Sequence, residues 1–208
     1  MLHQLPCRLL CANPLVAVAD GFLESGVCDR IINLSRDRLQ RAEVGTDDAV
    51  LEVTDARTNS ECTLPPDGYP EVSALMQRLA DALALPVSHG EGLSVLHYAI
   101  AEEFKPHADG IWSGAEPEAI AAFEADGGQR LFTAMVYLNS VEAGGGTSFP
   151  KLGFRVDPAP GRLLIFANTP AGDRDVTVRA LHAGEPVSAG EKWAAVSWWR
   201  ERPYASQS

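Results

Sequence analysis

The chain has 208 residues, a formal net charge of −11 and a pI of about 4.8, with 46% hydrophobic and 22% charged residues. These values are ordinary for a soluble globular protein, and the length suits one domain with a sizeable core, so we expect a single domain over residues 1–208. The acidic balance argues against nucleic-acid partners and against anionic membranes, because both require clustered basic side chains. No apolar run approaches the length of a membrane span.

The cysteines and the first residues indicate a reducing compartment. Four cysteines lie at positions 7, 11, 28 and 62 without a CxxC pair, so thiols are favoured over disulfides or a structural zinc site. Arg8, Asn13 and Pro14 interrupt the opening segment and make it a poor signal peptide. We therefore expect a cytoplasmic protein.

The first part of the chain predicts helices with few strands. A Val-rich run at 14–20 predicts a strand, and the apolar spacing over 22–39 predicts a helix capped by Ser25. A further candidate strand at 58–64 ends at a Pro-Pro-Asp-Gly turn. The clearest helix covers 70–85, with proline in its first turn and one apolar stripe along its length.

After these helices the pattern changes to short strands. They are rich in Val, Ile, Phe, Tyr and Trp and are separated by Gly, Pro and Asn. We expect strands at 93–100, 105–109, 130–138, 154–157, 162–167, 176–183 and 193–200. Helices followed by many strands predict a mainly β sandwich or barrel with helices on one face, the helical support covering about residues 20–85 and the β core about 91–202.

The stretch FKPHADG at 104–110 carries the first candidate site. His107 and Asp109 stand two residues apart in an expected strand, where alternation points both side chains to one face. A second histidine far along the chain, His182, would complete a set of two imidazoles and one carboxylate, which suits a non-heme Fe(II) oxygenase. A His-x-Asp pair alone is weak evidence, and a hydrogen-bonded histidine at a strand edge is the simpler interpretation.

Three further features favour the metal interpretation. Lys192 lies ten residues after His182 across an expected hairpin, and a lysine inside a barrel needs an anion such as a dicarboxylate co-substrate. Thr147 follows three glycines, where the backbone can approach a ligand closely. The aromatic run at 192–200, KWAAVSWWR, places indole surface beside the same site.

Residues 110–129 interrupt the strands directly after Asp109. They contain a short Ala-rich helical stretch that ends in glycine. Their position permits either a lid over the site or a plain surface excursion, and the sequence favours neither.

The order of these pieces resembles the prolyl 4-hydroxylase group of Fe(II)/2-oxoglutarate-dependent dioxygenases. Four runs carry the resemblance: LSVLHYAIAEEFKPHAD, GQRLFTAMVYLNSVEAGGGTSFP, FRVDPAPGRLLIFAN and LHAGEPVSAGEKWAAVSWWR. With the opening strand and helix it covers roughly residues 14–202, and its most specific part is the His–Gly–Pro–Val–Gly–Lys–Trp pattern near the end. The resemblance implies a double-stranded β-helix, a cupin-like jelly roll with the metal between its two sheets.

The resemblance also implies a role for each matching residue. The implied Fe(II) ligands are His107, Asp109 and His182. The implied contacts to 2-oxoglutarate are an ion pair from Lys192 and hydrogen bonds from Tyr98 and Thr147. The implied peptide contacts are Arg130, Trp198 and Arg57, the last in an ARTNS loop that resembles one folding over the peptide.

The implied reaction is hydroxylation of a C–H bond, with 2-oxoglutarate and O2 as co-substrates, succinate and CO2 as co-products, and ascorbate as a candidate reductant. The leading expectation is a dioxygenase acting on prolyl residues of a peptide or protein. A hydroxylase of a free amino acid or small metabolite, and a non-catalytic cupin-like binding or sensing domain, remain as alternatives. A halogenase is disfavoured because Asp109 fills the position that a chloride would need.

Three departures from the family pattern stand out. Ala101 replaces the glycine of Tyr-x-x-Gly, the Glu of Gly-Gly-Glu-Thr is missing before Thr147, and 110–129 is longer than usual. The first affects loop geometry and the last affects the substrate entrance, but none alters a metal ligand. A lysine at position 192 favours the collagen-type branch over the oxygen-sensing branch.

The remaining histidines have no assigned role. His3, His89 and His97 lack suitably placed partners in the sequence, so we expect structural positions for all three. Alternation points His97 away from the face of its neighbour Tyr98, and it likewise directs Trp199 into packing.

Overall fold

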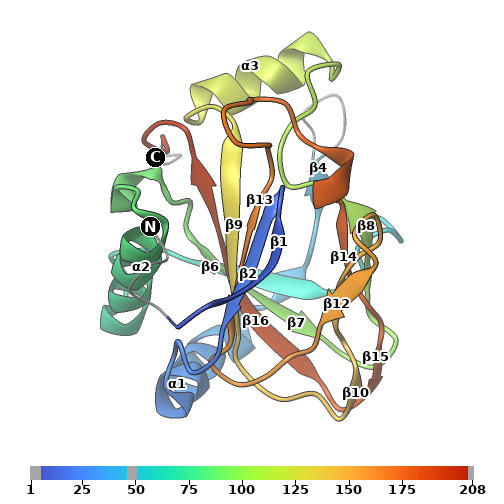
Figure 1. Cartoon of the computed structure of the whole chain (residues 1–208). Helices are drawn as coiled ribbons and strands as arrows, with labels where there is room; N and C mark the ends of the chain where they lie inside the picture. Colours follow the sequence, from blue (N-terminus) through green and yellow to red (C-terminus); the bar gives the residue numbers. More distant parts are fainter. Residues whose placement is uncertain (1–5, 46–50, 206–208) are drawn as a thin grey trace.

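The computed structural model describes residues 6–45 and 51–205, and it consists of two facing sheets with helices over the outer face of the larger one (Figure 1). The larger sheet has eight strands in the order β1-β2-β13-β9-β16-β7-β6-β3. Their bounds are β1 Arg8–Ala12, β2 Leu15–Ala19, β13 Leu163–Ala167, β9 Arg130–Tyr137, β16 Lys192–Arg200, β7 Leu93–Tyr98, β6 Ser60–Leu64 and β3 Gln40–Arg41.

The smaller sheet has four strands in the order β12-β11-β14-β8. Their bounds are β12 Phe154–Val156, β11 Thr147–Phe149, β14 His182–Gly184 and β8 Phe104–His107. Two short pairs complete the described strands, namely β10 Ala143–Gly144 with β15 Val187–Ala189 and β4 Val44–Gly45 with β5 Leu51–Glu52. The pairing within both sheets is antiparallel wherever the structure describes it.

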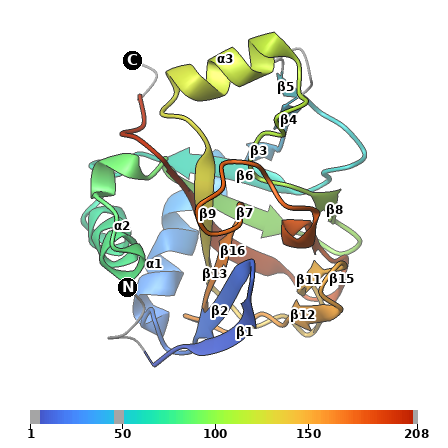
Figure 2. The same cartoon turned by 45° about the horizontal axis from the view of Figure 1, so that its top comes forward.

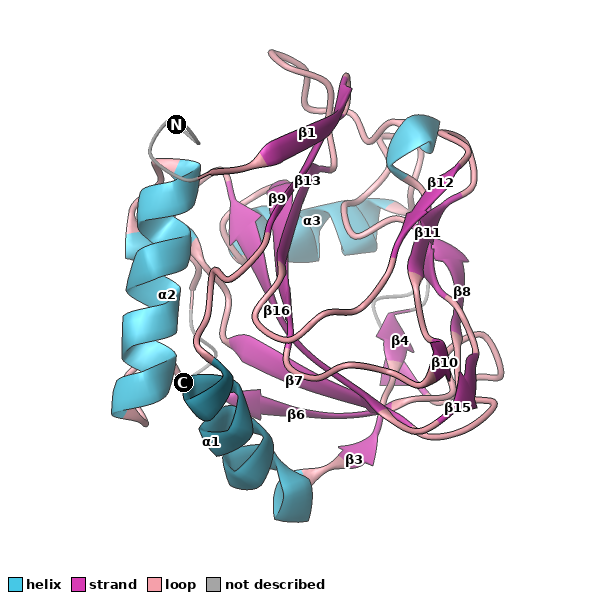
Figure 3. Cartoon of the chain, turned by 60° about the horizontal axis from the view of Figure 1, so that its bottom comes forward, coloured by secondary structure: helices cyan, strands magenta, loops and turns pink. Residues whose placement is uncertain are grey.

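The larger sheet is buried on both faces, which explains why its central strands read as continuous apolar runs. In β13, Leu163 and Ile165 belong to the core under the helices, whereas Leu164 and Phe166 belong to the core between the sheets. The two cores therefore share one sheet, and the smaller sheet closes the second core (Figure 3). This arrangement is the predicted β core with helices on one face.

Two helices cover the outer face, α1 (Ser25–Ser35) and α2 (Pro70–Leu83). The apolar stripe of α2 is buried as predicted, and the helix begins with its proline and ends at Ala84 in a left-handed conformation. The predicted cap of α1 is wrong, because Ser25 is the first helical residue and the N-cap is Glu24, whose side chain makes no capping hydrogen bond. In the part of the chain that the structure describes, no helix is both long and apolar enough to cross a membrane.

Most predicted strands are confirmed, with ends that differ by about two residues. The strand predicted over 176–183 is wrong for most of its length, since a short 3-10 helix at Val178–Ala180 precedes β14. The strand predicted over 105–109 ends early, at His107. Asp109 and Gly110 lie in a bend beyond it, and Gly110 is closely packed there, since a Cβ would lie 2.5 Å from the Gln129 Oε1 atom.

The departure noted at Ala101 has a structural consequence. This residue has φ 68, in the left-handed region that glycine adopts most readily, and its N–H donates to the Val187 carbonyl at 2.8 Å. The family's glycine therefore stands where the backbone requires positive φ, and alanine holds the same turn under strain.

We predict that Ala101→Gly raises the free energy of unfolding by about 0.5–1 kcal/mol, because relief of left-handed strain exceeds the added entropy of the unfolded chain. Urea unfolding measures the change. The matched control is Ala99→Gly, which lies in the same loop without positive φ and should lower stability. Equal effects of the two variants would contradict the assignment of strain to Ala101.

Candidate active site

The register between β14 and β8 brings two histidines together. His182 lies directly opposite His107, and their ring centroids are 4.3 Å apart. The turn beyond β8 then folds the Asp109 carboxylate between them, with Oδ1 3.5 Å from His107 Nε2 and Oδ2 3.5 Å from His182 Nε2. One donor atom from each residue lies within 4.8 Å of the others, so the predicted triad is assembled.

Backbone carbonyls fix which ring nitrogen of each histidine is free. His107 Nδ1 lies 2.8 Å from the Lys105 carbonyl, and His182 Nδ1 lies 3.1 Å from the Ala180 carbonyl. A carbonyl oxygen only accepts, so each Nδ1 carries a proton and each Nε2 presents a lone pair toward Asp109. Orientation through the second nitrogen is typical of metal-binding imidazoles.

The protonation states suit a divalent metal. Burial lowers the pKa of His182 to about 4, so this imidazole is neutral at pH 7. Burial alone would raise the pKa of Asp109, but the His182 and His107 side chains and a hydrogen bond from Thr133 hold it well below its usual range. Neutral imidazole nitrogens and a carboxylate oxygen form the donor set of non-heme Fe(II) sites, so these residues fit that ion.

A pocket with about 440 Å³ of empty space, part of it open solvent, surrounds the triad. Its walls contain every predicted co-substrate residue, namely Tyr98, Thr147 and Lys192. The sheet registers explain their convergence, because Lys192 stands opposite Tyr98 between β16 and β7, and Thr147 stands opposite Gly184 between β11 and β14.

Lys192 is a cation in this pocket with no carboxylate at ion-pair distance among the described residues, although Glu185 attracts it from farther away. Its residue is 1% exposed, and its Nζ atom lies 4.8 Å from the centre of the Tyr98 ring and 5.6 Å from that of Tyr137. It forms no hydrogen bond to any residue that the structure describes, and burial lowers its pKa to about 8. An ammonium buried in this way is costly unless an anion joins it, so the pocket fits a ligand that carries a carboxylate.

The predicted peptide residues take three different positions. Trp198 lines the pocket, whereas Arg130 is absent from the lining and stacks behind the indole, with its guanidinium carbon 4.2 Å from the ring centre. Arg57 also lines the pocket, but its guanidinium already donates to the Asn59 side chain, the Glu43 carbonyl and the Glu61 carboxylate.

Sequence reasoning missed two residues of the site. Thr133 donates from its hydroxyl to Asp109 Oδ2 at 2.6 Å, and the ring of Phe104 stacks on His107 with centroids 3.4 Å apart. Thr133 could have been found, because it is the one aliphatic hydroxyl in the apolar strand LFTAMVY. Phe104 carried no comparable signal, since one aromatic residue in a strand is ordinary.

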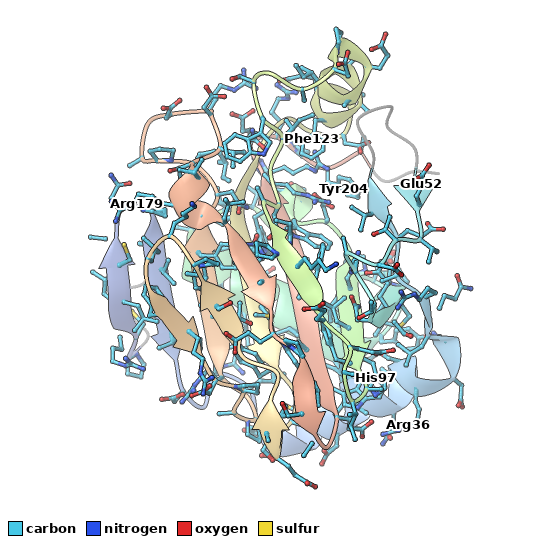
Figure 4. All side chains as sticks on the ribbon, turned by 90° about the vertical axis from the view of Figure 1, so that its right-hand side faces the viewer. Arg36, Glu52, His97, Phe123, Arg179 and Tyr204 are labelled. Atoms are coloured by element: carbon cyan, nitrogen blue, oxygen red, sulfur yellow. The ribbon has the colours of Figure 1, made fainter. Side chains whose placement is uncertain are left out.

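The insertion at 110–129 is docked on the protein through its helix α3 (Pro117–Ala125), which stands above the sheets in Figure 2. The ring of Phe123, a residue labelled in Figure 4, packs against two guanidinium groups. The guanidinium carbon of Arg200 is 4.8 Å from the ring centre and that of Arg130 is 5.6 Å from it. Glu91, which is 7% exposed, accepts from both guanidiniums at 2.6–2.7 Å. The buried charge cluster of Glu91, Arg130 and Arg200 lies between α3 and strand β16, which carries Trp198.

Two further contacts tie the insertion down. Glu124 pairs with Arg174 and with Arg202, each at 2.7 Å. At the base of the insertion, the Gln129 side chain accepts from the Ile111 N–H at 2.9 Å and donates to the Ile111 carbonyl at 2.7 Å. The insertion is therefore closed at its base and braced along its helix, and none of its residues lines the pocket, which favours the surface excursion over the lid.

The remaining histidines have partners that the sequence did not reveal. His97 Nε2 lies 2.9 Å from the Glu191 carboxylate, and His89 Nδ1 lies 3.0 Å from the Arg200 carbonyl, so both make hydrogen bonds outside the pocket, at structural positions. His97 does point away from the Tyr98 face, as predicted, and stacks on Trp193 instead. His3 lies outside the described residues, and Trp199 is fully buried in the core.

Two facing sheets around a two-histidine, one-carboxylate set define an iron-dependent oxygenase of the double-stranded β-helix class. The family model for the 2OG-Fe(II) oxygenase superfamily matches residues 93–200. The probable prolyl 4-hydroxylase 7 of Arabidopsis thaliana is 32% identical over 220 residues, which cover 94% of this chain and 67% of the relative. The chain belongs to the 2OG-Fe(II) oxygenase superfamily. The resemblance seen in the sequence is confirmed, and so is the expected dependence of the protein on Fe(II) and 2-oxoglutarate.

Solved structures agree with this assignment. A viral collagen prolyl hydroxylase from Paramecium Bursaria Chlorella virus-1, in its 2OG complex, superposes with a TM-score of 0.69 at 25% identity, covering 88% of this chain and 94% of the other. A prolyl hydroxylase from Trichoplax adhaerens, in complex with a hypoxia inducible factor peptide fragment, has the same fold with a TM-score of 0.65 at 18% identity, covering 89% and 83%. The expected jelly roll is thereby confirmed.

We predict that Glu91→Gln lowers the free energy of unfolding by about 3 kcal/mol, because two guanidiniums beneath α3 lose their shared carboxylate. Proteolytic cleavage within 110–129 should increase in parallel. Urea unfolding and limited proteolysis measure the two effects. Glu118→Gln is the matched control, since Glu118 is exposed on α3 and has no ion pair within the described part of the chain. A Glu91→Gln protein as stable and as resistant as this control would show that the charge cluster does not hold the insertion.

Proposed function

We propose that this chain hydroxylates prolyl residues of a peptide or protein, releasing succinate and CO2 from 2-oxoglutarate and O2. One observation carries the proposal: an unpaired, buried Lys192 ammonium shares a pocket with a complete two-histidine, one-carboxylate set. The ammonium would form an ion pair with a dicarboxylate, and the two-histidine, one-carboxylate set would bind the metal.

We assign the metal to His107, Asp109 and His182. When bound there, Fe(II) supplies the redox chemistry that activates O2 and cleaves a C–H bond. The chain holds both imidazoles neutral, with Nε2 free, and excludes bulk water through the burial of Asp109 and His182. Three protein donors leave positions of a six-coordinate ion for the co-substrates.

Lys192, Tyr98 and Thr147 are assigned to 2-oxoglutarate. Burial raises the pKa of Tyr98, so its hydroxyl stays protonated and can donate to a carboxylate. Thr147 accepts a hydrogen bond from the Tyr137 hydroxyl at 2.7 Å, which leaves its own proton available to the ligand. The Lys192 ammonium then supplies the charge, so one ion pair and two hydrogen bonds would hold the distal end of the co-substrate.

Trp198 is assigned to the peptide, with Arg130 bracing its ring from behind. Aromatic walls suit proline-rich segments, which lose little conformational freedom on docking. The Trp198 indole N–H is buried and has no acceptor among the described residues, so a backbone carbonyl of a peptide is a suitable partner. We place the Arg57 loop at the edge of the same groove.

The charges in the pocket favour a peptide over a free amino acid. A free amino acid carries its own carboxylate and would need a second available cation. The cations in the described lining are Lys192, which the co-substrate would occupy, and Arg57, whose guanidinium is already bonded to protein acceptors. A peptidyl proline brings no such charge.

The cellular setting is also a proposal. Cys28 and Cys62 are buried thiols outside any disulfide, and burial raises the pKa of both, which supports a reducing, cytoplasmic location. The net charge of −11 supports a partner other than nucleic acid or an anionic membrane. Ascorbate is proposed as the reductant that maintains the ferrous state, and omission of ascorbate during repeated turnover tests this.

We predict that the affinity for 2-oxoglutarate falls about tenfold per pH unit above pH 8, because Lys192 must then take up a proton before it can pair with the ligand. Below pH 8 the lysine is charged and the affinity should be nearly constant. Titration calorimetry on Mn(II)-loaded protein between pH 7 and 9.5 measures the dependence. The groups around Lys192 do not titrate in this window, since burial raises the pKa of Tyr98 and Tyr137 and lowers that of His182.

Lys192→Arg is the control for this experiment. A guanidinium stays charged throughout the range, so weaker binding without the loss above pH 8 is expected. Lys192→Met should bind 2-oxoglutarate weakly at every pH while retaining Mn(II). The co-substrate assignment is wrong if the parent and Lys192→Arg show the same pH dependence.

For the substrate, we predict hydroxylation of proline-containing peptides but not of free proline in the presence of Fe(II), 2-oxoglutarate and ascorbate. Mass spectrometry detects an added oxygen atom on the peptide, and succinate release reports turnover. Asp109→Ala should release no succinate above background. Trp198→Ala should lose peptide hydroxylation by about tenfold or more while keeping peptide-independent succinate release, because the indole contacts the peptide and not the co-substrate.

Two results would redirect this proposal. Oxygen incorporation into free amino acids but not into peptides would favour the small-metabolite alternative. Equal loss of both activities in Trp198→Ala would mean that the indole supports the barrel instead of the peptide.

A further inference from the structure

The two oxygens of the Asp109 carboxylate have different surroundings. Oδ1 lies 3.5 Å from His107 Nε2 and Oδ2 lies 3.5 Å from His182 Nε2, but Oδ2 also accepts a hydrogen bond of 2.6 Å from the Thr133 hydroxyl. Asp109 is 8% exposed and Thr133 is 2% exposed, so water does not compete strongly for this bond. Each oxygen is thus equally close to one ligand histidine, and the Thr133 hydrogen bond is what distinguishes Oδ2 from Oδ1.

Thr133 is placed for this contact by the centre of the larger sheet. It lies in β9, opposite Phe166 of β13 on one side and Trp198 of β16 on the other. A β-branched side chain on a central strand has little rotational freedom, so the hydroxyl position is well defined.

Asn168 determines the direction of the Thr133 hydroxyl. Its side-chain amide donates to Thr133 Oγ1 at 3.1 Å, so the threonine proton is directed to Asp109. The backbone of Asn168 is fixed as well, through its N–H to the Leu131 carbonyl at 2.9 Å and its carbonyl to the Thr177 N–H at 3.2 Å. The three side chains form a relay, meaning two successive hydrogen bonds from Asn168 to Thr133 and from Thr133 to Asp109.

One atom of this relay is unsatisfied. Asn168 is 1% exposed, and its Oδ1 has no hydrogen-bond partner among the described residues. A buried acceptor without a donor is unfavourable, and an apolar side chain of similar size would avoid it. The amide therefore has a use that offsets this cost, and its one side-chain partner is Thr133.

Counting coordination positions suggests that use. Two imidazoles and one carboxylate oxygen leave three positions of an octahedral ion, whereas two imidazoles and both oxygens leave two. A keto acid chelates through two positions and O2 needs another. A hydrogen bond that engages Oδ2 keeps the third position available.

We propose that Thr133, oriented by Asn168, is a positioning residue that restricts Asp109 to one metal-facing oxygen and so preserves the coordination positions that the co-substrates need. The inference rests on the proposed metal site and concerns the hydroxyl of Thr133, not the ligands. Loss of the hydroxyl should allow both oxygens to face the metal, which would maintain metal binding and impair chelation of 2-oxoglutarate.

The test compares Thr133→Val with Thr133→Ser and the parent, all loaded with Co(II). Valine keeps the shape and suits a central strand, and serine restores the hydroxyl. Calorimetry gives the affinities for Co(II) and for 2-oxoglutarate, and visible absorption of Co(II) reports changes in coordination on ligand addition. Ser94→Ala is the matched control, because Ser94 is a buried strand hydroxyl of the same sheet outside the pocket.

The expected result is selective. Thr133→Val should bind Co(II) about as tightly as the parent, bind 2-oxoglutarate at least about tenfold more weakly, and show a smaller spectral change on its addition. Thr133→Ser and Ser94→Ala should behave like the parent. If Thr133→Val does not fold, Asn168→Leu replaces it. Asn168→Leu should also weaken 2-oxoglutarate binding while keeping the Co(II) affinity, but by a smaller factor.

Two results would overturn the inference: equal loss of Co(II) and 2-oxoglutarate affinity, which means general loosening, and unaltered 2-oxoglutarate binding in Thr133→Val. Failure of the proposed function itself is distinguishable, because the parent protein would then bind Co(II) and 2-oxoglutarate as expected but hydroxylate no proline-containing peptide when loaded with Fe(II).

Discussion

His182 stands directly opposite His107 across two antiparallel strands of the smaller sheet, and the rest of the site depends on this register. Side chains alternate along a strand, so a slip of one residue would turn one histidine to the other face and separate the two nitrogens. The partner register in the larger sheet, Lys192 opposite Tyr98, aligns the ammonium with the same pocket. The registers of the two sheets thus bring His182 and Lys192 to the same pocket as His107 and Asp109, although the two pairs lie more than 70 residues apart in the sequence.

Polar groups without partners gather at this pocket. The Lys192 ammonium has no carboxylate at ion-pair distance, and the Asn168 Oδ1 atom and the Trp198 indole N–H have no hydrogen-bond partners, among the described residues. Each disfavours folding, because a buried polar group has lost its water. Two further buried indole N–H groups without partners, those of Trp193 and Trp199, belong to the core under the helices, so a ligand can complete only the groups at the pocket. Those pocket groups illustrate how a binding site reduces stability in exchange for function.

The insertion after Asp109 shows the opposite arrangement. Its charges are paired, with Glu91 shared between Arg130 and Arg200 and Glu124 shared between Arg174 and Arg202. Because the same Arg130 stacks on Trp198 and donates to the Asp109 carbonyl at 3.1 Å, the insertion is connected through Arg130 to the pocket-lining Trp198 and to the metal ligand Asp109. Changes in the insertion should therefore alter substrate positioning without any direct contact with the substrate.

The sequence by itself determined most of the central strands and the apolar stripe of α2, and through its family resemblance it determined the metal-binding triad and Lys192. Those features rest on local periodicity and on residue types whose chemistry allows few alternatives, such as a lysine expected inside a barrel. Only the tertiary structure revealed the Thr133 hydrogen bond, the Glu91 cluster and the early end of β8, because each depends on atoms from segments far apart in the chain. Side-chain alternation predicts which face a residue occupies, but the partner across that face is decided by how the two sheets and the insertion pack.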